Sequence, residues 1–214
     1  MLKEKLVFFQ EFLTHFDSVG SIIPSSRWAA EALTTQMRKR TQPIKILEVG
    51  PGTGPVTVKI LENMRAGDKF TICEINPRLM ELLKVKLQKH PQYDAHRENI
   101  DFFLGPVQEL PEKIQYDVIV CAIPFNNLPI AVIEEIFLKL KRLSHTETSL
   151  SFFEYLGVRS LGKIVSSSKR KAALEDIQDF YSELKKAHPF ESETVWLNIT
   201  PIRVYRAQLG ATVS

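Results

Sequence analysis

A glycine-rich loop between a short apolar run and a helix-forming segment carries the residues best suited to hold a ligand. The loop extends from Glu48 to Gly54 and follows the apolar run 44–47, which is typical of a buried strand. Glycine lets the backbone turn sharply and approach a ligand that a Cβ atom would push away. The helix expected at 55–64 directs its free N–H groups and its positive dipole end at the polar part of a ligand. The pattern therefore predicts a binding site at the start of this helix.

A second acidic residue, Glu74, ends the next apolar run at 69–73. An acid at the carboxyl end of a second parallel strand can accept hydrogen bonds from both hydroxyls of a ribose. A solvated carboxylate at a strand end is the plainer interpretation.

A dinucleotide-binding fingerprint is a competing interpretation of the glycine loop. It fits less well, because it places a third small residue three positions after the second glycine. Here Gly54 comes two positions after Gly52, and Pro55 occupies the position that must be small. An ordinary strand-to-helix turn remains the alternative.

The composition is that of one soluble globular domain over residues 1–214, with 44% hydrophobic and 25% charged residues. A net charge of +3 offers no global argument for nucleic acid binding. Cys73 and Cys121 fall within expected strands, so we expect small core residues in a reducing compartment and neither a disulfide nor a metal site. No signal peptide is expected, and no apolar run approaches the roughly 18 residues of a membrane span.

After Pro43 the chain alternates strand and helix patterns, which predicts a doubly wound, mostly parallel α/β sheet. The active site of such a sheet lies beyond the carboxyl ends of the strands. We expect the last two strands to form an antiparallel edge. The seven expected strands are 44–49, 69–74, 100–104, 116–122, 148–155, 193–199 and 202–208. The expected helices are 55–64, 77–89, a short turn near 107–112, 129–143 and 170–187.

Several polar and aromatic side chains follow the later strands. Val107 and Gln108 come after the third strand, and Ala122 begins the segment after the fourth. That segment continues through Phe125, Asn126 and Asn127, which offer a ring face and two amides to orient a substrate. The two asparagines alternatively cap the helix near Pro129. Glu154 and Tyr155 end the fifth strand, so we expect both to reach the site and to orient an amine or take its proton. An edge-of-core pair is the alternative.

Five segments together resemble the soluble bacterial phospholipid N-methyltransferases, which methylate phosphatidylethanolamine toward phosphatidylcholine. The glycine loop is shared by many methyltransferases, and the other four segments carry the resemblance. Two departures are Ala122-Ile123, where Gly-Leu is expected, and Thr200, where a second proline is usual. These departures bear on the choice of substrate more than on the type of reaction. The matching segments are 19–27, 48–54, 123–127, 152–157 and 195–201.

The resemblance implies a Rossmann-like class I methyltransferase with S-adenosylmethionine as cofactor and no metal. Ser25 and Ser26 then lie near the cofactor and the substrate entrance, with Ser25 assigned to the cofactor and Ser26 to the substrate. Family members place an acid after the third strand to bind the adenine amine. Pro106 departs from this pattern, so Gln108 or a backbone carbonyl must substitute. The expected cofactor contacts are Glu48, Gly50, Pro51, Gly52, Thr53, Gly54, Glu74, Ile75, Val107, Gln108, Ala122 and Ser25.

Two further segments agree with a lipid substrate. Residues 1–16 place Leu2, Leu6, Phe9, Leu13 and Phe16 on one helical face, which suits a bilayer interface or, equally, a core helix. We assign 1–42 to N-terminal helices that contact the membrane and cover the substrate, and 43–214 to the catalytic core. The basic segment 157–171 includes Arg159 and Lys163, which are candidates to bind a lipid phosphate beside Ser26 and Phe125. A solvated basic loop is the alternative. These features predict a cytoplasmic protein held peripherally at the inner face of the membrane.

Three alternatives remain open. An rRNA adenine N6-dimethyltransferase needs an asparagine two positions before Pro124, where this chain has Ala122. A small-molecule amine methyltransferase fits if the N-terminal helix packs in the core. A membrane-bound module that binds the cofactor without turnover belongs to a different class, and the intact loop and acidic pair argue against it.

Overall fold

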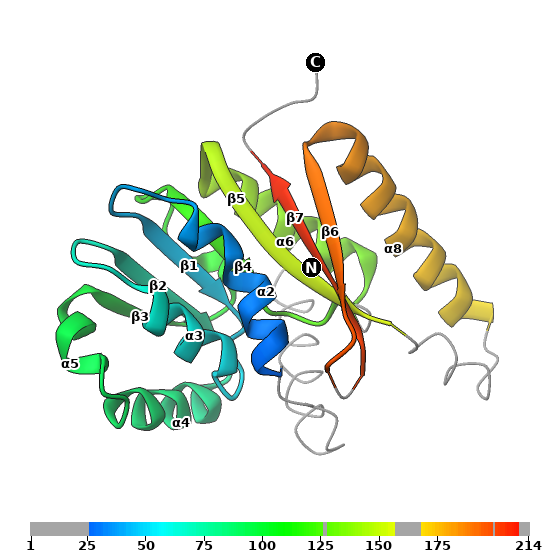
Figure 1. Ribbon diagram of the computed structural model, residues 1–214. Helices are drawn as coiled ribbons and strands as arrows, with labels where there is room; N and C mark the ends of the chain where they lie inside the picture. The colour runs from blue at the N-terminus through cyan, green and yellow to red at the C-terminus, as the bar shows by residue number, and fades with distance from the viewer. Residues whose placement is uncertain (1–25, 126–127, 157–167, 199, 210–214) are drawn as a thin grey trace.

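The computed structural model describes residues 26–125, 128–156, 168–198 and 200–209, and within these ranges the chain builds one seven-stranded sheet (Figure 1). The strand order is β3-β2-β1-β4-β5-β7-β6. This confirms the predicted doubly wound α/β fold. The strands are β1 (Lys45–Val49), β2 (Lys69–Glu74), β3 (Ile100–Leu104), β4 (Tyr116–Cys121), β5 (Ser144–Tyr155), β6 (Phe190–Val195) and β7 (Ile202–Gln208).

Strands β1 to β5 are parallel to one another, and β7 runs antiparallel to both β5 and β6. The last two strands thus form the antiparallel edge that the sequence predicts. Two strands have boundaries that differ from the expectation by three residues or more. Strand β5 begins at Ser144 because that residue pairs with Tyr116 before a register shift. Strand β6 spans 190–195 instead of 193–199, since its pairing partners are residues 202–207 of β7.

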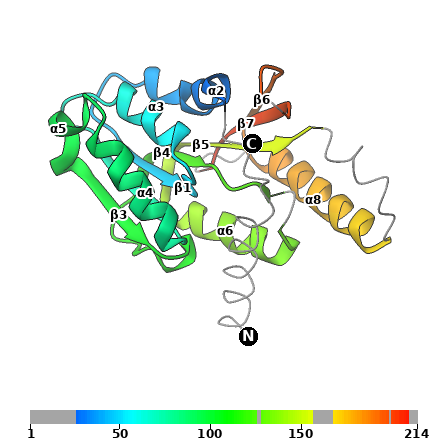
Figure 2. The ribbon, with the colours of Figure 1, turned by 90° about the horizontal axis from the view of Figure 1, so that it is seen from below.

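Helices cover both faces of the sheet (Figure 2). On one face, α2 (Arg27–Arg38), α3 (Pro55–Asn63) and α4 (Pro77–Gln88) bury apolar side chains in a cluster that includes Ile46 of β1, Phe70 of β2 and Val118 of β4. On the other face, α6 (Ile130–Arg142) and α8 (Ser168–Ala187) bury apolar side chains in a cluster that includes Leu47 of β1 and Phe152 of β5. Short helices complete the order: α5 (Tyr93–His96) and the 3₁₀ turns Arg97–Asn99 and Val107–Glu109. Helix α2 is the described part of the expected N-terminal helices.

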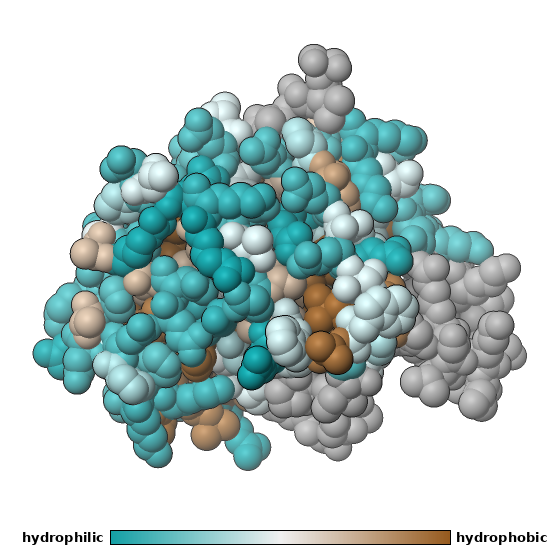
Figure 3. All heavy atoms as spheres, viewed as in Figure 1, coloured by the Kyte–Doolittle hydropathy of each residue, from teal (hydrophilic) through white to brown (hydrophobic). Residues whose placement is uncertain are grey.

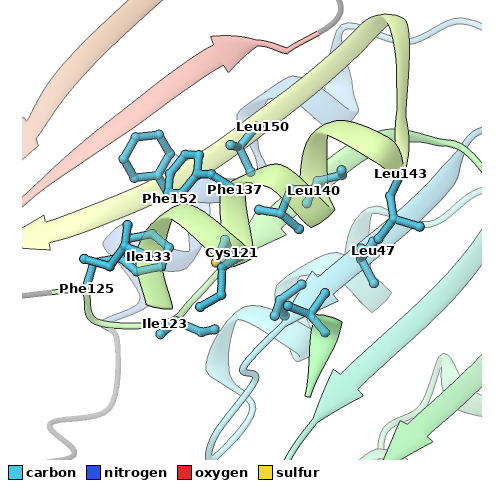
Figure 4. Close-up of a cluster of buried hydrophobic side chains, with 14 of the residues drawn as sticks. Leu47, Cys121, Ile123, Phe125, Ile133, Phe137, Leu140, Leu143, Leu150 and Phe152 are labelled. Carbon is cyan, nitrogen blue, oxygen red and sulfur yellow. The ribbon is translucent and has the colours of Figure 1, made fainter. Parts of the chain in front are cut away.

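The alternation of strand side chains decides which residues reach which face. Leu47, Cys121 and Phe152 belong to the cluster under α6 shown in Figure 4. Cys73 and Cys121 are both free and buried, in agreement with their predicted core role, and burial raises the pKa of the Cys121 thiol to about 12. By the same alternation, Glu48 and Glu74 point to the opposite face, toward α3 and α4. No helix among the described residues is long and apolar enough to cross a membrane.

Candidate active site

The glycine loop continues directly from the sheet and then turns into α3. The Gly50 N–H donates to the Cys73 carbonyl at 2.9 Å, and the Ala122 N–H donates to the Val49 carbonyl at 2.8 Å. These bonds extend the parallel ladder by one residue and bring the ends of β1, β2 and β4 side by side. Further along, the Gly105 N–H donates to the Glu74 carbonyl at 2.9 Å and adds the end of β3. The predicted convergence of strand ends is therefore present.

Three glycines of the loop adopt positive φ angles, of +72° at Gly50, +56° at Gly52 and +80° at Gly54, where other residues are strained. A Cβ atom on Gly50 would lie 2.8 Å from Ile123 Cγ1, and one on Gly54 would lie 2.3 Å from Leu83 Cδ1. These two glycines allow close packing within the protein. A Cβ atom on Gly52 would meet nothing within 4 Å, so this glycine borders open space at the site.

Glu74 is held beside the loop by backbone donors. Its side chain is buried, and its two carboxylate oxygens accept the Gly52 N–H at 3.1 Å and the Asn76 N–H at 2.9 Å. Asn76 in turn caps α4, because its Oδ1 accepts the N–H groups of Arg78 and Leu79. The fold thus brings the second acid against the glycine loop, as the sequence predicts. Sequence reasoning missed the support from Asn76, although an asparagine before a proline is a signal for a helix start.

Glu48 is the most unusual group of the site. It is fully buried, and neither carboxylate oxygen has a hydrogen-bond partner of normal geometry among the described residues. Burial raises its pKa from 4.5 to about 8; the nearby Thr57 hydroxyl opposes this change and the Glu74 carboxylate adds to it. Because a buried carboxylate without donors is costly, this side chain suits a ligand that brings N–H groups or positive charge.

Gln108 offers a second buried acceptor without a partner. Its Oε1 atom makes no hydrogen bond among the described residues, while its neighbour Val107 packs in the core. An amide oxygen at this strand end can accept from an exocyclic amine, which is the contact predicted for adenine. The orphan acceptors of Glu48 and Gln108, together with the open space at Gly52, fit S-adenosylmethionine, a ligand with a positive charge, an amino acid tail and an adenine.

The remaining predicted cofactor contacts surround this loop. Pro51 is buried, Ile75 and Ala122 are half-buried, and Thr53 is exposed. The Thr53 carbonyl accepts a hydrogen bond from the Lys86 ammonium at 2.9 Å, which ties the loop to α4. Several predicted site residues lie outside the described residues: Ser25, Asn126, Asn127, Arg159 and Lys163. Their roles stay predictions.

Glu154 and Tyr155 reach the carboxyl end of β5 but point to opposite faces of the sheet. Glu154 is buried under α8, where it accepts the Tyr205 hydroxyl at 2.5 Å. Tyr155 packs on the α2 face, with its ring edge-on to Phe153 at 5.2 Å between centroids. Burial raises the pKa of the Tyr155 phenol, which keeps it protonated. The two side chains therefore do not lie together in one site. This follows from their adjacent positions, because successive side chains of a strand point to opposite faces of the sheet.

Two expected substrate contacts are used for packing and capping. Phe125 is fully buried, with its ring centroid 5.3 Å from that of Phe137 and 6.1 Å from that of Phe152 (Figure 4), so its ring faces the core. The Ser26 hydroxyl accepts the Ala29 N–H at 3.2 Å and caps α2.

Sequence reasoning missed Tyr205. Its hydrogen bond to Glu154 joins positions 51 residues apart, so no local sequence pattern indicates it. No cluster of metal ligands occurs among the described residues.

Known proteins that this chain resembles are methyltransferases. A family model described as a methyltransferase domain matches residues 46–146. The ornithine lipid N-methyltransferase of Singulisphaera acidiphila is 24% identical over 148 residues, which cover 66% of this chain and 73% of that protein. The demethylmenaquinone methyltransferase of Lactococcus lactis is 27% identical over 139 residues, which cover 62% of this chain and 52% of that protein.

Solved structures share the fold at low sequence identity. The O-methyltransferase TomG of Streptomyces achromogenes, solved in complex with S-adenosylmethionine, has a TM-score of 0.69 at 13% identity, with 98% of this chain and 89% of that chain covered. An O-methyltransferase of Bacillus cereus, solved with S-adenosylhomocysteine, has a TM-score of 0.64 at 12% identity, with 96% and 90% covered. These likenesses support the architecture.

Proposed function

We propose that this S-adenosylmethionine-dependent methyltransferase methylates the amine of a phospholipid head group, converting phosphatidylethanolamine toward phosphatidylcholine. The observation that carries this proposal is the relative from Singulisphaera acidiphila, whose name specifies N-methylation of a lipid. The segments 123–127, 152–157 and 195–201 support it from outside the cofactor loop. The protein would meet this substrate peripherally, at the cytoplasmic face of the membrane.

Four residues described above would hold the cofactor: Glu48, Gly52, Glu74 and Gln108. When bound, S-adenosylmethionine supplies a methyl group on a positively charged sulfur. The protein needs no covalent intermediate for such a displacement, and its contribution is alignment of the substrate and exclusion of water. The buried surroundings of the two acids provide that dry environment on the cofactor side.

The substrate amine must lose a proton before it can accept a methyl group. A free alkylammonium has a pKa of about 10, and burial next to a positive charge lowers it. We propose that the protonated Tyr155 phenol orients the amine through its oxygen lone pairs. The Asn126 and Asn127 amides are further candidates to orient the head group.

The test uses purified protein, methyl-labelled S-adenosylmethionine and vesicles of phosphatidylethanolamine mixed with an anionic lipid, followed by lipid extraction and separation. Label in mono-, di- or trimethylated phosphatidylethanolamine is the expected result. A Glu74→Gln variant serves as the control, since it should weaken cofactor binding, and circular dichroism checks that its fold is kept. Parallel incubations with ornithine lipid, small amines and rRNA separate the alternatives. Intact cofactor binding with no labelled phospholipid would overturn the proposal.

A further inference from the structure

Three large apolar side chains are exposed near one end of the molecule. Trp28 is 44% exposed, Trp196 is 73% exposed and Leu197 is 66% exposed. Trp28 lies in the first turn of α2, while Trp196 and Leu197 follow β6 in its connection to β7. Exposed tryptophan is costly in water but favourable where an apolar layer meets a polar one. We call Arg27, Trp28, Trp196 and Leu197 the tryptophan rim.

A direct hydrogen bond joins the two segments of the rim. The Ser26 N–H donates to Asn198 Oδ1 at 2.8 Å, and Asn198 Nδ2 donates to the Thr200 carbonyl at 2.8 Å. Asn198 is buried, so this link is part of the folded structure. It ties the start of α2 to the β6–β7 connection, with one tryptophan two positions away on each side. Figure 3 shows apolar side chains gathered in this region of the surface.

The rim lies at the edge of the sheet where the chemistry is expected. Tyr155 pairs with Ile202 of β7, and Ile202 pairs with Val195 of β6, so the three residues form one row across the sheet. Trp196 comes directly after this row. The Leu156 N–H also donates to the Pro201 carbonyl at 2.7 Å, which joins the end of β5 to the same connection. A surface that docks here would therefore face the end of β5.

The charge of the rim suits an anionic surface. The Arg27 guanidinium lies 4.5 Å from the centre of the Trp28 ring and makes no ion pair among the described residues. Acids of the neighbouring elements form ion pairs of their own. Glu31 pairs with Lys59 at 2.8 Å, and Glu193 pairs with Arg206. The rim thus combines apolar rings with an available positive charge at the positive end of a helix.

We propose that the tryptophan rim docks the protein on a bilayer that contains anionic phospholipid, with Trp28, Trp196 and Leu197 entering the interfacial layer and Arg27 contacting phosphates. A second copy of the chain fits less well, because stable interfaces use about 20–30 residues from each partner. Shallow insertion into lipid requires only a few apolar side chains beside a positive charge. This inference rests on the proposed lipid substrate and adds the surface that meets it.

Tryptophan fluorescence tests the proposal directly, since Trp28 and Trp196 are the two tryptophans of the whole chain. The full-length protein is mixed with vesicles of phosphatidylethanolamine and phosphatidylglycerol, with and without bromine on the acyl chains. The Trp28→Phe variant leaves Trp196 as the single fluorescent tryptophan, and the Trp196→Phe variant leaves Trp28. We expect both emissions to shift to the blue and to be quenched by brominated lipid. Sedimentation of the protein with vesicles without any quenching would overturn the proposal, because another segment would then carry the binding.

A triple variant that changes Trp28, Trp196 and Leu197 to Ser tests the consequence. It should bind vesicles at least about tenfold more weakly and methylate vesicle lipid more slowly, while its rate on dispersed short-chain phosphatidylethanolamine stays unchanged. Leu138→Ser, which alters a 53% exposed leucine of α6, is the matched control and should bind like the wild type. Unchanged vesicle binding of the triple variant would refute the docking surface. Failure of the wild type to methylate dispersed lipid would instead refute the proposed function.

Discussion

Replacing Glu48 by glutamine should make the protein without cofactor more stable at neutral pH. The unfolded chain titrates this carboxyl near 4.5, whereas burial raises its pKa to about 8 in the folded protein. Between these values the folded state binds more protons than the unfolded state, so its stability falls as pH rises. A difference of one bound proton lowers the unfolding free energy by about 1.4 kcal/mol for each pH unit. The fall between pH 5 and pH 8 therefore amounts to roughly 3 kcal/mol from this one group.

The assay is urea unfolding of the wild type and Glu48→Gln at pH 5, 6, 7 and 8, without cofactor. The difference in unfolding free energy between the two proteins should be smallest at pH 5 and should grow by roughly 3 kcal/mol toward pH 8, in favour of glutamine. Most other titrating groups are common to both proteins and cancel in this difference. Parallel stability curves over this pH range would refute the argument, since Glu48 would then titrate normally.

The same group should make cofactor binding depend on pH. A positively charged ligand favours the ionised carboxylate, so the affinity of the wild type for S-adenosylmethionine should increase from pH 6 to pH 8. Glu48→Gln should bind more weakly at pH 8 and lack this increase. Isothermal titration calorimetry of both proteins measures the effect. An equal pH dependence in the two would show that another group is responsible.

Substitutions at three further residues test the site. Gly54→Ala places a Cβ atom against Leu83 at a positive φ angle, and it should lower the unfolding free energy by about 2 kcal/mol or more in denaturant titrations. Tyr205→Phe removes the hydrogen bond to Glu154 and leaves a buried acceptor, so thermal unfolding should show a loss of about 1–3 kcal/mol. Tyr155→Phe should reduce kcat while leaving KM for the lipid nearly unchanged, whereas Tyr155→Ala should also raise KM. Equal kinetic losses in both variants would argue against a role of the ring.

The predicted arrangement of elements and of the glycine loop was most accurate where the signal is local in the chain. The order of strands and helices follows from apolar periodicity, and the loop at 48–54 follows from glycines that all adopt positive φ. The carboxyl ends of parallel strands meet at one edge, so the approach of Glu74 to Gly52 follows from topology alone. Neighbouring residues of a strand point to opposite faces of the sheet, so the sequence already predicts opposite orientations for Glu154 and Tyr155. The expectation that both side chains reach one site was therefore wrong.

By itself, the sequence determined the α/β order, the glycine loop and the two acids, because these depend on neighbouring residues and on the regular periods of strand and helix. Tertiary structure alone decided the burial of Phe125 among rings from α6 and β5, since packing joins segments without any sequence signal. It also decided the bond between Ser26 and Asn198, which are 172 residues apart. The raised pKa of Glu48 was likewise decided by the tertiary structure, because it depends on how completely the surrounding elements exclude water from the carboxyl group.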